Sequence, residues 1–263
     1  MTAGGQAEEQ AVPGALARFG FLSRGIVYVL IGGIAARVAI LQRGSATGPA
    51  GALARILTGS GGRLLLWIVV AGLFAFVLFR VLQGVRTRRP LSRIFYFTSG
   101  LGGLVLAIAA VRVLLQFRSG ADEAGLRDLA ARLLSHDWGR LGLGLGGVIA
   151  IVIGGVEAVR AVLGRLPADF TAAIMARVQR KWTSVLARLG MFAHGIVAAI
   201  IGYSICRAAL EENARALGGT GTALRTLRHS GSGPVLLGLV AVGLIAYGLS
   251  LLVLAAHARL RSR

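Results

Sequence analysis

Six long apolar stretches, separated by polar connections, dominate the pattern of this 263-residue chain. Each run is continuous rather than alternating, and each is long enough for the roughly 20 helical residues that cross a bilayer. A helix also satisfies its backbone hydrogen bonds within one span, which a single strand cannot do. The pattern therefore predicts membrane-spanning helices near residues 20–42, 62–83, 93–116, 139–163, 189–210 and 233–257.

The six stretches form three tandem pairs, and the first member of each pair repeats one pattern. Residues 16–37 and 186–207 are identical at ten of 22 aligned positions, at a constant offset of 170. The middle copy, at an offset of 75, keeps one glycine and both flanking arginines: Arg93, Gly100 and Arg112 for Arg18, Gly25 and Arg37. Because an internal repeat fixes the architecture, we expect an all-α polytopic membrane protein, with six transmembrane helices arranged as three tandem helical hairpins in a pseudo-threefold bundle.

The repeat also divides the chain into units. Residues 16–86, 87–165 and 186–260 are predicted to form membrane hairpin repeats 1, 2 and 3. Residues 1–15 are polar and carry two acidic residues without a basic start, so we expect a short disordered tail there. The recurrence of the first apolar stretch in two later positions argues against its removal as a signal peptide.

Two of the connections are amphipathic at helical spacing. In residues 121–135 the leucines recur on one face with charged residues opposite, which predicts a helix at the membrane interface. Residues 166–185 form a basic amphipathic linker whose apolar residues recur at every fourth position: Phe170, Ile174, Val178 and Trp182. Such a segment suits the surface of an anionic leaflet, and equally a cap on the helix bundle.

The composition excludes an ordinary soluble enzyme. Only 15% of the residues are charged and 56% are hydrophobic, whereas a soluble domain averages about 25% charged residues. The net charge of +19 could suggest nucleic acid as a partner. The basic residues, however, lie mostly at the ends of apolar stretches and in the connections, without a continuous face interleaved with aromatics. We therefore expect anionic membrane lipids as partners, and no nucleic acid.

Charge along the connections predicts the orientation. The links at 84–92 and 164–188 and the C-terminal tail are basic, whereas the other three links hold most of the acidic residues. By the positive-inside rule, both termini are expected in the cytoplasm. Lys181 is the only lysine among many arginines, which indicates a GC-rich bacterial genome and therefore the plasma membrane.

An arginine, three glycines and a second arginine recur in the outer copies, at Arg18, Gly20, Gly25, Gly32 and Arg37 and at Arg188, Gly190, Gly195, Gly202 and Arg207. With two helices per unit and three units, this pattern resembles the domain of unknown function 1206 family of bacterial integral membrane proteins. The resemblance covers nearly the whole chain, and it implies the fold but no activity, cofactor or ligand. The middle copy departs from the pattern, because Phe95 and Ala107 replace two of the glycines.

Three polar residues occupy equivalent positions in the repeat, each directly before a shared glycine: Arg24, Ser99 and His194. Around a pseudo-threefold axis these side chains either converge or all face away. Convergence would form a small polar vestibule, since polar groups within spans usually face a bundle interior. The alternative, which we favour, is that Arg24 snorkels toward the head groups, Ser99 bonds to its own helix and His194 meets interfacial water.

Glu157 is the only acidic residue within or at the edge of a span, and a membrane carboxylate is a functional candidate. A local pair with Arg160, or with Arg80 of the neighbouring unit, is the simpler expectation. Ser99 and His194 could also serve an intramembrane hydrolase, but no further base or oxyanion device is evident. No cofactor is expected, and the histidines and the single cysteine predict no metal site.

Glycines crowd the fourth span. Gly142 and Gly146 have the spacing that lets helix backbones touch, so they are candidates for packing against a partner helix or a second copy of the chain. The stretch around them follows no strand and does not support a nucleotide site.

Together these observations favour a non-enzymatic membrane protein that organises lipid or protein partners. A small transporter or channel with its path along the pseudo-threefold axis is the second hypothesis, and an intramembrane hydrolase the third.

Overall fold

A computed structural model of the protein describes residues 3–42, 47–57, 61–88, 90–116, 121–165, 180–229 and 232–257. Within those ranges the chain is helical and contains no strand. Six helices are long and apolar enough to cross a membrane: α1 (Ala3–Leu41), α3 (Gly62–Arg86), α4 (Pro90–Gln116), α6 (Asp137–Val162), α8 (Arg180–Leu210) and α10 (Gly233–His257). The all-α, six-span prediction is confirmed.

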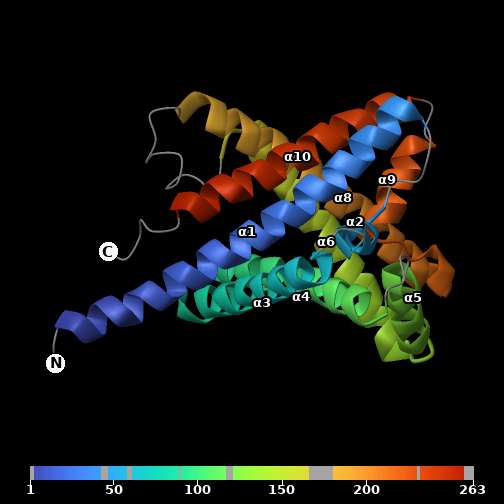
Figure 1. The fold of residues 1–263 in the computed structure, drawn as a ribbon. Coiled ribbons are helices and arrows are strands. Elements are labelled where there is room, and N and C mark those ends of the chain that lie inside the picture. The colour runs from blue at the N-terminus through green and yellow to red at the C-terminus, as the bar shows by residue number, and fades with distance from the viewer. Residues whose placement is uncertain are drawn as a thin grey trace.

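Short helices follow the first long helix of each repeat: α2 (Pro49–Leu57), α5 (Ala121–Leu134), the 3-10 turn η1 (Ala214–Ala216) and α9 (Thr220–Arg228). In Figure 1, α2, α5 and α9 gather at the end of the molecule away from the start of α1. The helix predicted in residues 121–135 is confirmed by α5. Helices α2 and α9 were not predicted from their connections.

Two expectations about the flanking segments turn out differently. The disordered tail predicted for residues 1–15 is wrong from Ala3 onward, because α1 begins there and continues without a break into the first span. The basic linker predicted for residues 166–185 lies outside the described residues up to position 179, and its last residues belong to the first turns of α8.

The long helices follow one another around the bundle in the order α1, α3, α4, α6, α8, α10. Each junction between repeats is packed: α3 against α4, α6 against α8, and α10 against α1. Figure 1 shows the last pair side by side along most of its length. The hairpins of repeats 1 and 3 are also packed, α1 on α3 and α8 on α10. In the described part of the chain, α4 and α6 form no comparable pair, so the middle hairpin is open, and α5 contacts both of its helices.

Glycine positions explain why the outer hairpins close. Gly20 in α1 lies so near α3 that an added Cβ would be 2.6 Å from the Cα of Phe76. Its repeat equivalent Gly190 approaches the backbone of Tyr247 in α10 in the same way. The middle repeat has Phe95 at this position, and a phenyl ring is too large for the close approach that glycine allows.

A second contact of the outer hairpins is also lost in the middle repeat. Gly72 of α3 lies against Ser23 of α1, and the equivalent Gly243 of α10 lies against Ala193 of α8. The corresponding residue of α6 is Ile149, which is 50% exposed. Bulky side chains therefore stand at both close-approach positions of the middle repeat, and α4 and α6 separate.

The junctions between repeats follow the pseudo-threefold pattern more closely. A Cβ on Gly25 would lie 2.9 Å from the carbonyl oxygen of Gly248, and one on Gly195 would lie 2.5 Å from that of Gly154. These are equivalent contacts, at α1–α10 and α8–α6. Such small residues let two helix backbones approach where lipid offers no hydrophobic drive for association.

Two of the repeated arginines close these junctions. Arg18 donates from Nε to the carbonyl oxygen of Ala255, over 3.2 Å, and Arg188 donates to that of Ala161, over 2.9 Å. Both acceptors lie near the C-terminal end of a helix, where carbonyl groups lack intrahelical partners and the helix dipole favours a cation. These arginines join one repeat to the next, in addition to marking the ends of the spans.

Candidate functional site

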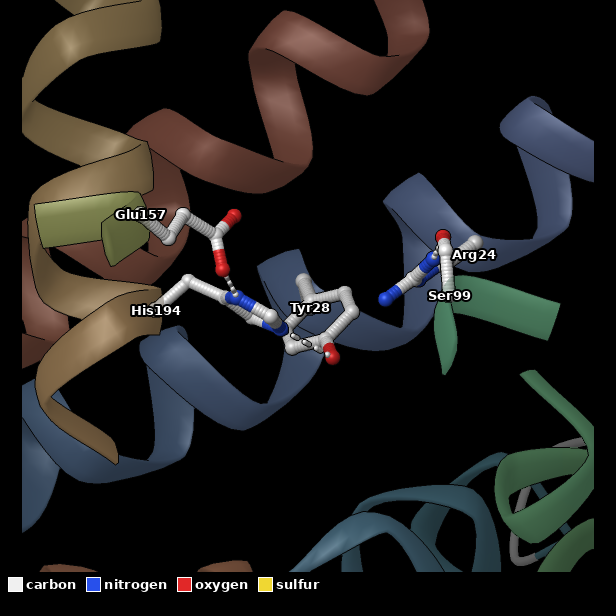
Figure 2. Close-up of polar contacts among 5 residues, drawn as sticks. All are labelled: Arg24, Tyr28, Ser99, Glu157 and His194. Atoms are coloured by element: carbon white, nitrogen blue, oxygen red, sulfur yellow. Dashed lines mark hydrogen bonds and ion pairs between the residues drawn. The ribbon is translucent and has the colours of Figure 1, made fainter. Parts of the chain in front are cut away.

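A layer of polar side chains lies inside the bundle, at the level of Arg24. The side chain of Arg24 comes from α1 and is only 5% exposed. It donates from Nη1 to the Oγ of Ser99 in α4, over 3.3 Å, and its guanidinium lies over the rings of Tyr28 and Phe76. Figure 2 shows Arg24 and Ser99 meeting across the two helices. The Nε atom of Arg24 is buried and has no hydrogen-bond partner among the described residues.

A second set of contacts continues the layer from α1 to α8 and α6. The hydroxyl of Tyr28 and Nε2 of His194 are 3.0 Å apart, and Nδ1 of His194 lies 2.9 Å from a carboxylate oxygen of Glu157. The imidazole stacks on Tyr247 of α10, with ring centroids 4.5 Å apart. Figure 2 shows the carboxylate, the imidazole and the phenol following one another in a chain.

Arg80 of α3 completes the layer. It is 4% exposed and its Nη1 donates to the side-chain oxygen of Gln83, one turn later, over 2.8 Å. Its guanidinium lies among aromatic rings, at 5.2 Å from the centroids of both Phe21 and Phe76. Cation–π contacts of this kind stabilise a charged group that has little water around it. All six long helices therefore contribute a side chain to this layer.

Arg24 and Ser99 meet directly, and His194 joins them through Tyr28. The interpretation that we favoured from the sequence is therefore wrong for Arg24 and Ser99. Arg24 does not snorkel, because its side chain is buried and bonded to Ser99. Ser99 accepts from another helix, and it is the neighbouring Thr98 that bonds back to its own helix. His194 contacts Tyr28 and Glu157, and Ser99 and His194, both described, do not bond to each other.

Glu157 also has a different partner from the expected one. It pairs with His194 across the α6–α8 junction, rather than with Arg160 or Arg80. Arg80 and Glu157 occupy equivalent positions of α3 and α6. Each faces the first helix of the next repeat, through Tyr96 for Arg80 and through His194 for Glu157. His194 belongs to the first helix of its repeat and Glu157 to the second helix of its repeat. Aligning first helices with one another, or second helices with one another, could therefore not show that these two residues meet.

Sequence reasoning missed the aromatic members of the layer, Tyr28 and Tyr247. Tyr28 lies one helical turn after Arg24 and therefore on the same face, which is the one signal that could have found it. Tyr247 is equivalent to Phe76 of repeat 1. Because the equivalent residue is an apolar Phe, the repeat gave no reason to place Tyr247 in a polar layer. Its stacking on the imidazole of His194 depends on how α8 and α10 pack.

The glycines of α6 divide between two faces. Gly147 and Gly154 are buried against Cys206, Gly195 and Ala199 of α8. The predicted packing residues Gly142 and Gly146 lie on the other side, where an added Cβ would meet nothing within 4 Å. In the described part of the chain they pack against no other helix, which leaves this face of α6 open to a partner.

The described residues contain no cluster of three or more potential metal ligands. Cys206, the single cysteine, lies in the α6–α8 junction, where its thiol is 3.7 Å from the carbonyl oxygen of Gly144. Its surroundings are those of a packing residue.

Comparison with known proteins gives a family without an assigned activity. The family model described as Domain of Unknown Function (DUF1206) matches three times, at residues 19–87, 94–164 and 189–258. The chain is also 28% identical, over 240 residues, to the uncharacterized protein YxxB of Bacillus subtilis (strain 168); the match covers 88% of this chain and 86% of that protein. No solved structure matches.

Proposed function

The chain belongs to the DUF1206 family of unknown function, and on that premise we propose that it is a non-enzymatic membrane protein that associates with another helix through the open face of α6. A single observation carries this proposal. Only 11% of the most apolar stretch of α6 is buried within the chain, compared with 33–61% for the other five spans. Because α6, among the described residues, packs against α8 and α5 but not against α4, the rest of its surface is available for a partner.

The open face of α6 has the chemistry of a helix-packing surface. Gly142 and Gly146 lie one turn apart on open space, flanked by the exposed side chains of Leu145 and Ile149. In bilayers, a small-xxx-small pair lets two backbones come into contact, and larger flanking residues then pack around it. The same type of contact already joins α6 to α8 through Gly154 and Gly195.

The partner that we propose is a second copy of this chain. One face presented by two identical helices is self-complementary around a twofold axis, which is the commonest symmetry of oligomers. The side chain of Trp138, at the start of α6, is 86% exposed, and a tryptophan at the membrane interface fixes the depth of its helix. Two copies of α6 held at the same depth place their glycine pairs at matching levels.

Association can be measured by energy transfer between donor- and acceptor-labelled full-length protein in liposomes diluted with increasing lipid. We expect a dimer that Gly146→Leu weakens about five- to thirtyfold, since the contact loses roughly 1–2 kcal/mol. Gly33→Leu is the matched control, because Gly33 also faces open space, on α1. A monomeric wild-type protein, or equal effects of the two variants, would overturn the proposed dimer.

Transport along the pseudo-threefold axis is the second candidate function, and the polar layer is the observation that favours it. Ionisable residues inside a membrane often mark a path for ions or protons. The groups in this layer bond to one another and Arg24 is buried, so the layer must rearrange before a solute passes. Liposome flux assays test this directly. Reproducible flux that is abolished by Arg24→Ala would replace the association hypothesis with transport.

The proposal includes a location and a lipid environment. The basic links support a bacterial plasma membrane with both termini in the cytoplasm, and the bond from Arg18 to Ala255 agrees with the two ends lying on the same side. Anionic lipids suit the positive charge of these links. Reactivity of single cysteines introduced near each terminus, in intact and in permeabilised cells, tests the orientation.

A further inference from the structure

The three junctions between repeats differ in how their ends are closed. At α1–α10 and at α8–α6, an arginine of the first helix reaches the last carbonyl groups of the preceding helix. At α3–α4 the equivalent arginine is Arg93, and its guanidinium lies over the ring of Phe97, 6.0 Å from the centroid. The end of α3 is therefore not covered by the residue that covers its two counterparts.

A cavity of about 260 Å³ opens at this third junction, lined by Phe79, Leu82, Gln83, Arg86, Thr87 and Tyr96. Its lining has two chemical parts. Phe79, Leu82 and the ring of Tyr96 are apolar and continue into the span, whereas Arg86 and Thr87 lie where α3 ends and polar groups begin. This division matches the boundary between the hydrocarbon and the head groups of a bilayer.

The buried Arg80 orients the side chain of Gln83, which lines the cavity. Its Nη1 donates to the oxygen of Gln83, so the amide nitrogen of Gln83 is the part of that side chain left to donate to another group. The guanidinium of Arg86 makes no hydrogen bond or ion pair with the described residues, and it lies one turn farther toward the end of α3. Residues with amide, guanidinium and hydroxyl donors, Gln83, Arg86 and Thr87, thus line the same cavity.

We propose that this cavity binds the phosphate group of an anionic phospholipid, with the lipid glycerol and upper acyl chain against Phe79, Leu82 and Tyr96. Donors without a matching carboxylate favour an anion, and guanidinium groups bond phosphate oxygens strongly. The apolar wall favours an amphiphile over a free ion. The site is separate from the open face of α6 and does not depend on dimer formation.

The test uses detergent-purified full-length protein titrated with dioleoylphosphatidylglycerol or with dioleoylphosphatidylcholine, with bound lipid counted by native mass spectrometry. We expect phosphatidylglycerol to bind more tightly, and Arg86→Gln to weaken it about fivefold, as for loss of one basic residue near an anionic lipid. Thr87→Phe keeps the charge but fills the cavity, and is expected to weaken binding at least as much.

Arg160→Gln is the matched control, because Arg160 lies in the last turn of α6 and is exposed, outside the cavity. It removes the same charge and should leave binding within about twofold of wild type. Equal binding of the two lipids, or equal losses in Arg86→Gln and Arg160→Gln, would overturn the proposal. A third arm uses inorganic phosphate alone. If phosphate does not displace the bound lipid, the phospholipid site is supported. If free phosphate binds, and the same variants weaken its binding, a phospholipid is not the occupant.

Discussion

The outer and middle repeats of this protein descend from one pattern, yet they pack differently. Repeats 1 and 3 close their hairpins on glycines, Gly20 and Gly190, that bring the first helix against Phe76 or Tyr247 of the second. Repeat 2 has Phe95 and Ile149 at its close-approach positions, and α4 and α6 are apart. The comparison teaches that small residues, rather than chain connectivity, decide which neighbouring helices pack in this bundle.

The open middle repeat has consequences for both proposed interactions. Separation of α6 from α4 leaves the face of Gly142 and Gly146 uncovered. On the other side of α4, Arg93 leaves the end of α3 uncovered, next to the cavity that contains Arg86. Both proposed sites therefore lie beside the helices of the repeat that departs most from the family pattern.

The largest expected effect is in disulfide trapping across the three hairpins, in a Cys206→Ala background. The pair Ser23→Cys with Gly72→Cys, and the pair Ala193→Cys with Gly243→Cys, join positions that are in contact. The added Cβ atom at Gly72 would lie 2.7 Å from that of Ser23, and the one at Gly243 would lie closer still to that of Ala193, whereas the Cβ atoms of a disulfide are about 3.5–4.5 Å apart. We therefore expect both pairs to cross-link on mild oxidation after a small separation of the helices. The equivalent middle pair, Thr98→Cys with Ile149→Cys, should not cross-link. Efficient trapping of that pair, read on non-reducing gels, would show that the middle hairpin closes.

The second effect is on stability. Gly190→Ala places a methyl group against the backbone of Tyr247, and we expect the free energy of unfolding to fall by about 2–3 kcal/mol, as for overpacking of a tight contact. Gly33→Ala adds the same methyl group to open space and should change it by less than about 1 kcal/mol. Thermal unfolding in detergent measures both, and similar values for the two would contradict the close hairpin contact.

The polar layer should matter next, because it holds α6 to α8 where α6 lacks support from α4. His194→Leu leaves the carboxylate of Glu157 without its partner, and we expect a loss of about 1–3 kcal/mol. In the double variant His194→Leu with Glu157→Leu, the loss in the free energy of unfolding should be smaller than the sum of the two single losses by about 1 kcal/mol. Thr98→Val is the control, because it removes a hydroxyl that, among the described residues, bonds to its own helix. Additive losses would mean that the two residues act independently.

The smallest effects concern the arginines that close the junctions. Arg18→Gln and Arg188→Gln each remove a charged donor from helix-terminal carbonyl groups, and we expect each to lower the free energy of unfolding by about 1 kcal/mol. Arg93→Gln should change it by less than about 0.5 kcal/mol, because in the described part of the chain Arg93 lies over Phe97 and makes no such bond. Equal losses in all three variants would remove the proposed difference between the junctions.

Several features of the site could be predicted only in part. The repeat placed Arg24, Ser99 and His194 at one level, because residues equivalent in a repeat take equivalent places in the fold. It could not show whether they point inward, since the choice depends on the rotation of each helix about its axis. The substitution of Phe95 for a glycine was visible, but the sequence did not show that the equivalent glycines of the outer repeats lie against Phe76 and Tyr247.

The sequence by itself determined the number, length and repetition of the helices, because apolar runs of membrane length leave the backbone no alternative to the helix. Only the tertiary structure decided which helices pack, which polar groups meet and which faces stay open. Those outcomes depend on contacts of a few ångströms between residues far apart in the chain, such as His194 with Glu157, and on the single places where a Cβ does or does not fit.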